Sequence, residues 1–410
     1  MKSRLLLMLA LIGFLVPQKS LAWGDEGHSI VALVAQQILM NQSASDPSAA
    51  AALKSLNSIL AGMKIDEAAT WPDKVKNQSR ECHEAPFVKD PNYGKDGKKG
   101  LSSAVCDAYK YTSGWHFINS DSSEYVMNPS APDHFKGDMV ILIKGLSHVL
   151  KGERADVLNG VTSYTNWKRE CLKKGDANPS QACKREALSF LIHLVGDVHQ
   201  PIHGGAECDL GANTQFITFF GLEKDAGAFW CKPTDPPDCN NHELHQAWDV
   251  NLLRHDPGGN PFTTNQNYVS KIMRSFAKSR ESSDAKRCVR VTPDAAVSTD
   301  EPNGANGWVN ESLCYMQQVY TFPDDPKMAK NGKDGRSVAE AVNAVPNRCR
   351  ADKKVATPRG SAYSPVIIAD KYYATNIATI NERLYWAGSR LANVLKDIYG
   401  SGDKVADFSK

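Results

Sequence analysis

Apolar residues recur along one side of most of this chain at the spacing of an α-helix. Between Gly27 and Met40 they fall three or four positions apart, which predicts a helix with one buried face. The same periodicity predicts helices over residues 27–40, 48–60, 138–150, 181–199, 243–254, 268–278 and 368–398. Strand-like alternation is rare, with 214–220 the best candidate for part of one short β-hairpin. The pattern therefore predicts an all-α fold, a single compact multi-helix domain.

Three stretches interrupt the helical pattern. Residues 86–105 are rich in Gly, Lys and Asp, and residues 279–306 and 324–365 are rich in Pro, Asp, Gly, Ser and Lys. Such composition is typical of loops. We expect one domain over residues 23–410, with insertions at about 279–306 and 324–365.

The first 22 residues have the layout of a secretory signal peptide. Lys2 and Arg4 precede an apolar run from Leu5 to Val16, and small residues end the segment at Ala22. A run of this length is shorter than the roughly 20 residues that span a bilayer. Cleavage after Ala22 would release a secreted or periplasmic protein without stable membrane association, and would leave Trp23 as its first residue.

The charge balance excludes a protein that captures nucleic acid by a general basic field. The chain has 48 basic and 46 acidic residues, and removal of the first 22 residues leaves 45 basic residues against 46 acidic ones. Binding of a polyanion would therefore depend on a local site.

The cysteines indicate an oxidising compartment. There are ten, an even number, and no pair has the CxxC spacing of a thiolate zinc site. Their connectivity cannot be read from sequence. The pairs Cys82/Cys106 and Cys171/Cys183 are plausible disulfide bonds because each pair is close in sequence.

The densest group of metal-binding residue types lies in the segment FLIHLVGDVHQPIH, residues 190–203. His193 and Asp197 are four positions apart on a predicted helix, so both side chains point to the same side. Pro201 ends the helix and turns the chain, which brings His203 toward the same pocket. His199 would lie on another side of the helix, and we expect it to support the ligands rather than to bind metal.

A second pair repeats this spacing in HELHQAWD, residues 242–249. His245 and Asp249 are again four apart on a predicted helix, and imidazole and carboxylate are common zinc ligands. An ordinary solvated ion pair has the same spacing, but the neighbouring cluster favours metal binding. His242, about one turn earlier, is a weaker alternative.

Three shorter motifs place His or Asp near a tryptophan: WGDEGH at 23–28, WPDKVK at 71–76 and WHFIN at 115–119. Together with the two helical pairs, they resemble the S1/P1 nucleases. These are secreted zinc-dependent single-strand nucleases and 3′-nucleotidases whose fold is related to that of bacterial zinc phospholipase C. The matching motifs run from Trp23 to Asp249.

The resemblance implies three zinc ions held by nine residues. The α-amino group and carbonyl of Trp23, with His28 and Asp197, would bind one zinc. Asp73, His116, His193 and the shared Asp197 would bind a second zinc close by. The third zinc would be bound by His203, His245 and Asp249.

The resemblance also implies a mechanism and substrate contacts. A hydroxide bridging the close zinc pair would attack phosphorus, with Asp73 orienting it and Lys76 neutralising charge on the phosphate. Phe117 would stack on a nucleobase, although the sequence alone favours a core position for it. Asn119 and Asn213 would contact the base edge, and Asn119 replaces the aspartate of many relatives. Preference among single-stranded DNA, RNA and 3′-nucleotides stays open, as does the oligomeric state.

Two other functions are compatible with these motifs. A zinc phospholipase C would share the fold and metals, but those enzymes end the last ligand pair with glutamate, where this chain has Asp249. They also place the first histidine further from the terminal tryptophan than His28 lies from Trp23. A non-catalytic secreted zinc-binding protein is the second alternative, and the complete set of nine ligand positions disfavours it.

Overall fold

The computed structural model describes the helical body of the chain. The described residues are 23–83, 109, 111–118, 125, 138–173, 179–205, 211–213, 216–219, 242–255, 265–278, 288, 298–300, 304–321, 366–402, 406 and 408. The predicted signal peptide, the loop at 86–105 and nearly all of the two predicted insertions lie outside them. The helix Ala305–Val319 begins where the first insertion was expected to end.

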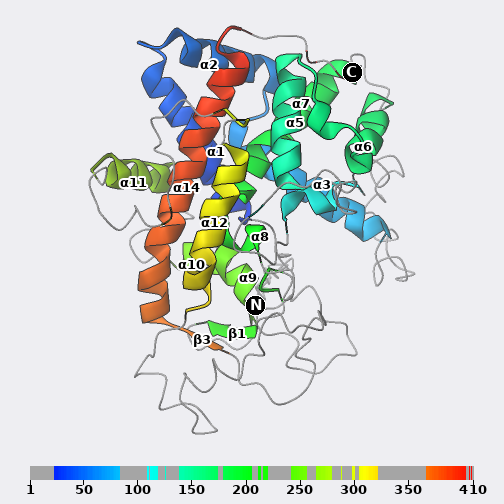
Figure 1. Ribbon diagram of the computed structural model, residues 1–410. Helices are drawn as coiled ribbons and strands as arrows, with labels where there is room; N and C mark the ends of the chain where they lie inside the picture. Colours follow the sequence, from blue (N-terminus) through cyan, green and yellow to red (C-terminus); the bar gives the residue numbers. More distant parts are fainter. Residues whose placement is uncertain are drawn as a thin grey trace, which may run out of the picture.

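Helices dominate the described residues, and the all-α prediction is confirmed (Figure 1). In chain order the elements are α1 (Asp25–Gln42), α2 (Pro47–Leu60), α3 (Ile65–His83), η2 (Ser113–His116), α5 (Met139–Lys151), η4 (Asp156–Leu158), α6 (Thr162–Leu172), α7 (Pro179–Asp197), α8 (Pro201–Gly204), β1 (Phe216–Phe219), β2 (His242–Glu243), α9 (Leu244–Gln246), η7 (Ala247–Asn251), α10 (Leu252–Arg254), α11 (Asn265–Lys278), α12 (Ala305–Val319), β3 (Val366–Ile368) and α14 (Asp370–Tyr399).

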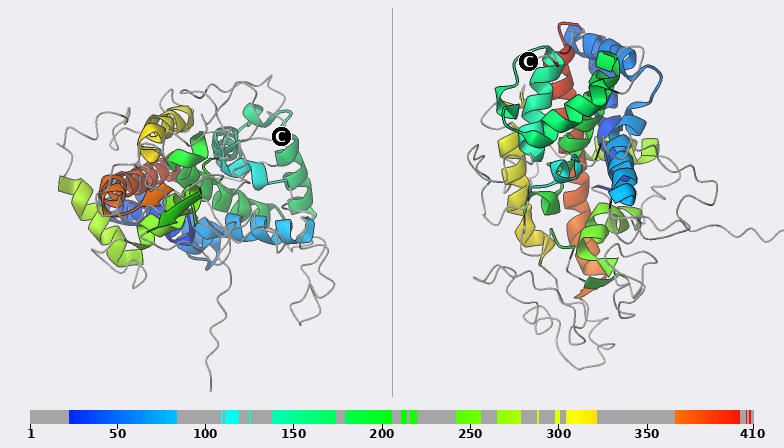
Figure 2. Two further views of the ribbon diagram at one scale, coloured as in Figure 1. Left: turned by 90° about the horizontal axis from the view of Figure 1, so that it is seen from below. Right: turned by 90° about the vertical axis from the view of Figure 1, so that its right-hand side faces the viewer.

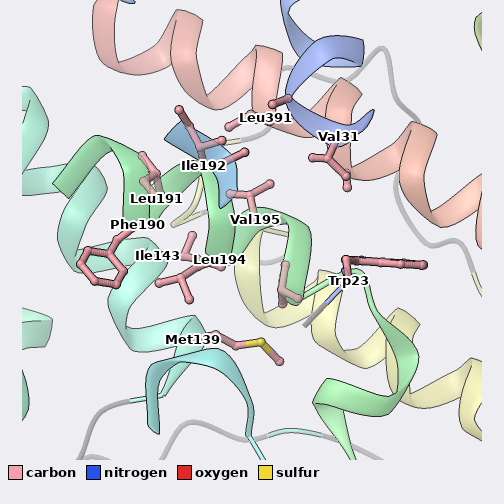
Figure 3. Packing of buried hydrophobic residues seen from close by; sticks show 14 of the residues in the cluster. Trp23, Val31, Met139, Ile143, Phe190, Leu191, Ile192, Leu194, Val195 and Leu391 are labelled. Atoms are coloured by element: carbon pink, nitrogen blue, oxygen red, sulfur yellow. The ribbon is translucent and has the colours of Figure 1, made fainter. Parts of the chain in front are cut away.

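The bundle is organised around α14, which has 30 residues, and α7 (Figures 1 and 2). The first helix, α1, packs along α14, although the two are at opposite ends of the chain. Gly388 permits this approach, since a Cβ there would lie 2.4 Å from Cγ1 of Val34. On α7, Figure 3 shows Val195 and Ile192 near Val31 of α1 and Leu391 of α14, with Ile143 of α5 near Leu194. These apolar side chains belong to one core.

Among the described helices longer than four residues, three were not predicted from periodicity, namely α3, α6 and α12. The reason is clearest for α3 and α12, because both bury polar groups. Asp73 and Lys76 of α3 are buried, as are Glu311 and Ser312 of α12. An inward face that carries charges and hydroxyls does not produce an apolar stripe, so the helical signal is lost.

The predicted strand near 214–220 is present as β1, but it is the centre of a three-stranded sheet rather than half of a simple hairpin. β1 pairs antiparallel with β2, through Phe216 with Glu243, and parallel with β3, through Ile217 with Val366. The third strand comes from a part of the chain about 150 residues away. No local pattern could have revealed that pairing.

Two disulfide bonds are present among the described cysteines. Cys171–Cys183 links α6 to α7, as predicted, and Cys288–Cys314 ties an upstream segment to α12. The predicted pair Cys82/Cys106 falls outside the described side chains. Among the helices of the described residues, none combines the length and apolar character needed to cross a membrane.

A fully buried charge network joins α12, α14 and the end of α7. Glu311 accepts hydrogen bonds from Arg383 at 3.0 Å and from Arg390 at 2.6 and 2.8 Å. Arg383 Nε also donates to the carbonyl of His199 at 2.9 Å, and Ser312 donates to that of Val198 at 2.6 Å. The network therefore fixes the backbone immediately after Asp197, the last residue of α7.

The first prediction concerns this network. Glu311→Gln removes the only described carboxylate bonded to the two buried guanidinium groups. Breaking a buried pair in this way costs about 3–5 kcal/mol of unfolding free energy. Chemical denaturation would measure the loss. Glu170→Gln, where the carboxylate contacts exposed Arg169 and Lys173, is the control and should cost at most about 1 kcal/mol. Equal losses in the two variants would contradict the assignment.

Candidate metal centre

The predicted ligand side chains converge from separate elements into one buried site. His28 comes from α1, Asp73 from α3, His116 from η2, and His193 with Asp197 from α7. His203 follows on α8, and His245 with Asp249 come from the helix that begins at α9. All are buried except His245, whose side chain is 13% exposed.

The Asp197 carboxylate lies at the centre of this site. Four imidazole rings place a nitrogen within 3.4 Å of its oxygens. Oδ1 lies 3.3 Å from Nε2 of His28, and Oδ2 lies 3.2 Å from Nε2 of His193. Burial by itself would raise the pKa of Asp197, but the surrounding histidines lower it well below its usual range. The group is therefore an anion that several cationic or metal-bound partners can share.

Three sets of side chains have ligand atoms that all lie within 4.8 Å of one another. They are His28 with Asp73 and His193, His116 with His193 and Asp197, and His203 with His245 and Asp249. The last set contains the three side chains predicted for the third zinc. The first two sets overlap at His193, so the division of ligands within the close pair stays a prediction.

Two of the histidines have the environment of metal ligands. His193 Nδ1 lies 2.7 Å from the carbonyl oxygen of Ala69, and His245 Nδ1 lies 2.5 Å from that of Gly211. A carbonyl accepts only, so each Nδ1 carries a proton, and Nε2 is the nitrogen available to a metal when the ring is neutral. In both rings Nε2 faces a carboxylate of the site. This arrangement fixes the tautomer that metal binding needs.

His199 has no ring nitrogen left for a metal. Its Nδ1 bonds the carbonyl oxygen of Val195 at 2.7 Å, and its Nε2 lies 2.9 Å from a guanidinium nitrogen of Arg390. Burial, together with Arg383 and Arg390, lowers the pKa of His199 well below its usual range. The neutral His199 ring connects Val195 near the end of α7 to Arg390 of α14. This agrees with the expectation that His199 is not a metal ligand.

The site contains buried polar atoms that have no hydrogen-bond partner. Among the described residues they include Oδ2 of Asp73, both carboxylate oxygens of Asp197, both ring nitrogens of His28 and His203, Nε2 of His116 and Oδ2 of Asp249. Buried polar atoms are normally paired, because leaving them unpaired is costly. Imidazole nitrogens and carboxylate oxygens in such a set fit a metal ion such as zinc. The residues at this site therefore fit a bound metal ion.

The N-terminal end of the described chain is anchored within this site. The Trp23 side chain is fully buried, and its indole Nε1 donates to the carbonyl of Gly196 at 2.9 Å. The next residue, Gly24, donates its N–H to the carbonyl of Asp249 at 2.9 Å. These two bonds fix the main chain of Trp23 between the end of α7 and the helix that carries Asp249.

Lys76 makes a close ion pair with Oδ1 of Asp73, one helical turn away on α3. Burial would raise the pKa of Asp73, but Lys76 and the histidines lower it below its usual range. Burial and the Lys76 charge lower the pKa of His116 to about 3. Asp73 is thus ionised and His116 neutral at neutral pH, which are the forms that bind metal.

The predicted substrate residues have different outcomes. Phe117, adjacent to His116, is 40% exposed, so the expectation from sequence alone of a core position was wrong. Asn213 Nδ2 lies 3.2 Å from Nδ1 of His245, which places the amide beside a candidate ligand. Asn119 lies outside the described residues. Contact of these residues with a base stays a prediction.

Two buried polar residues near the site were not identified from sequence. Gln200 donates from its side-chain amide to Oδ1 of Asp249 at 2.8 Å. Glu243, on β2, is buried, and burial together with the charge of Asp249 raises its pKa to about 8. Gln200 was missed because the HQPIH motif was interpreted through its histidines, and a glutamine at this position belongs to no recognisable spacing pattern.

The second prediction concerns Gly196 of α7, whose missing side chain lets His28 and Trp23 approach this helix closely. A Cβ at this position would lie 2.9 Å from Nδ1 of His28. Alanine is normally preferred over glycine within a helix, but here Gly196→Ala must displace the His28 ring from Asp197. We expect about tenfold weaker zinc affinity at the close pair, measured by metal analysis after equilibration with a zinc buffer. Ser180→Ala, on the exposed start of α7, is the control, and equal zinc affinity in both variants would refute the prediction.

Comparison with known proteins agrees with this geometry. The family described as S1/P1 Nuclease matches residues 23–400. Endonuclease 5 of Arabidopsis thaliana is 21% identical over 94% of each chain. Nuclease P1 of Penicillium citrinum is 24% identical over 58% of this chain and 68% of its own. Nuclease S1 of Aspergillus oryzae is 22% identical over 62% of this chain and 63% of its own. The chain belongs to the S1/P1 nuclease family, whose members are metal-dependent.

Proposed function

We propose that this protein is a secreted zinc-dependent nuclease. Its substrates would be the phosphodiester bonds of single-stranded DNA and RNA and the 3′-phosphate of nucleotides. The observation that carries the proposal is the convergence of buried, unpartnered imidazole and carboxylate atoms around Asp197 and Asp249. Membership in a family of nucleases supports the reaction class.

The nine predicted ligands would bind three zinc ions. Trp23 and His28 would share Asp197 with Asp73, His116 and His193 at a close pair of ions, and the third ion would occupy the set of His203, His245 and Asp249. Zinc supplies a bound water of lowered pKa and polarises phosphate oxygens when it is present. Magnesium and calcium are disfavoured because they prefer all-oxygen ligands.

The role of Asp73 and Lys76 follows from their contact. The Lys76 ammonium keeps Asp73 ionised, so this carboxylate can bind metal and accept a hydrogen bond from the attacking water. Lys76 is itself 9% exposed, and its charge lies beside the site. A phosphate entering from solvent would therefore meet a cation close to the nucleophile, where charge develops on its oxygens.

In this proposal Phe117 would select single strands. Its exposed ring directly follows the candidate ligand His116 in the chain. The next residue, Ile118, donates its N–H to the carbonyl of His203 at 2.9 Å, so the backbone on both sides of Phe117 is tied to the site. An aromatic ring at the edge of a metal site can stack on an unpaired base of any sequence. Paired bases are already stacked and would not reach it.

We include secretion in the proposal because of the residues at the N-terminus. The α-amino group of Trp23 can bind metal only after the first 22 residues are removed. The indole bond of Trp23 and the backbone bond of Gly24 are compatible with a chain that starts in the site. Export to the periplasm or to the medium would supply the signal peptidase and an oxidising compartment, in keeping with Cys171–Cys183 and Cys288–Cys314.

The third prediction tests the activity. The mature chain beginning at Trp23 should hydrolyse single-stranded DNA and RNA, and a chelator should abolish the cleavage. Zinc should restore it, whereas magnesium should not. Duplex DNA and phosphatidylcholine are the comparison substrates. Hydrolysis of phosphatidylcholine alone would favour the phospholipase, and the absence of all cleavage with three zinc ions bound would favour a non-catalytic zinc protein.

The fourth prediction tests the role of the free amino terminus. A chain with one extra residue before Trp23 should lose one zinc ion and at least about tenfold of its activity, since the amine would become an amide without a lone pair for metal. Addition of the same residue after Lys410 is the control. Full zinc content and activity in the extended chain would contradict the proposed first zinc site.

A further inference from the structure

Gln200 lies between two of the candidate ligands of the third metal and contacts the elements that carry both. Its side chain is fully buried. The amide nitrogen donates to Oδ1 of Asp249 at 2.8 Å, and the amide oxygen accepts a longer bond from the N–H of Ile202 at 3.4 Å. Ile202 precedes His203 in the single turn of α8.

These two bonds require a carboxamide. The Asp249 carboxylate can only accept a hydrogen bond, and the backbone N–H of Ile202 can only donate one. Among side chains of this length, glutamine supplies a donor and an acceptor from one end group at neutral pH. A glutamate at this position would place a second negative charge against buried Asp249.

The bond from Gln200 decides which oxygen of Asp249 can face a metal. Oδ1 is occupied by the amide, whereas Oδ2 has no hydrogen-bond partner among the described residues and lies 3.0 Å from Nε2 of His245. The two free ligand atoms, Oδ2 and Nε2, therefore lie side by side. Loss of the amide would release the carboxylate to rotate.

The second bond acts on the other ligand. Gln200 caps the N-terminus of α8 and accepts the N–H of His203 through its own carbonyl at 3.1 Å. His203 Nε2 lies 3.7 Å from the same Oδ1 of Asp249 that Gln200 holds. One residue thus sets the positions of Asp249 and His203 relative to each other, although they are 46 residues apart in sequence.

We propose that Gln200 is a positioning residue for the third metal site, and that it acts on that site selectively. Its two side-chain hydrogen bonds go to Asp249 and Ile202, and neither is a ligand predicted for the close pair. Outer contacts of this kind commonly change metal affinity by about 10–100-fold when they are removed. The inference rests on the proposed zinc-dependent function.

The test is zinc affinity at single-site resolution. Gln200→Met keeps the size of the side chain and removes both hydrogen bonds. In a series of chelator-buffered zinc concentrations, wild-type protein should bind three zinc ions. The variant should bind one of them about 10–100-fold more weakly and the other two unchanged. Excess zinc should restore both occupancy and nuclease activity.

A second measurement identifies the site. His245→Ala deletes a ligand of the third metal and should remove one zinc ion. Adding Gln200→Met to it should remove no further zinc, because both changes act on the same ion. Gln318→Met is the control. That glutamine also makes several side-chain hydrogen bonds, to the Thr375 carbonyl and to Asn376 and Thr379, but far from the ligands in sequence.

The outcomes separate this inference from the proposed function. Three zinc ions bound with unchanged affinity in Gln200→Met would overturn the inference and leave the nuclease proposal intact. Fewer than three zinc ions in wild-type protein would overturn the proposed metal content itself. If Gln200→Met does not fold, the shorter amide in Gln200→Asn should show the same selective loss. Failure of both variants to fold in excess zinc would assign Gln200 to the fold and overturn the inference.

Discussion

The buried carboxylate of Asp197 is the constraint on which the rest of the structure depends. An ionised group without water is stable only when partners surround it, and here imidazoles from α1, η2, α7 and α8 approach within 3.4 Å. Each of those elements must reach the last turn of α7. The packing of the first helix against that turn, through Trp23 and Gly196, follows from the same requirement.

That last turn is held from the opposite side by helices that supply no ligand. Arg383 and Arg390 of α14 share Glu311 of α12, and the network bonds the carbonyl and the ring of His199. A buried array of this kind stabilises the fold only when it is complete. The candidate ligands thus lie on one side of the end of α7, and the buried charge network lies on the other.

The sequence predicted best where helices bury aliphatic side chains. The segments 27–40 and 48–60 were predicted closely, as was the last helix, because their periodicity reflects contact with the core. Helices α3 and α12 were missed because their buried faces carry Asp73, Lys76, Glu311 and Ser312. The π-helical turn η7 at Asp249 was missed as well, since the spacing of His245 and Asp249 is also that of an ordinary helix.

The sequence by itself determined the chemistry that is available: the residue types, their i,i+4 spacing and a family resemblance that named every candidate ligand. Only the tertiary structure decided how those groups are presented. The proton on His193 is fixed by the carbonyl of Ala69, 124 residues away, and the orientation of Asp249 by Gln200, 49 residues away. Such contacts leave no local pattern, because their partners meet only when the chain has folded and water has been excluded from between them.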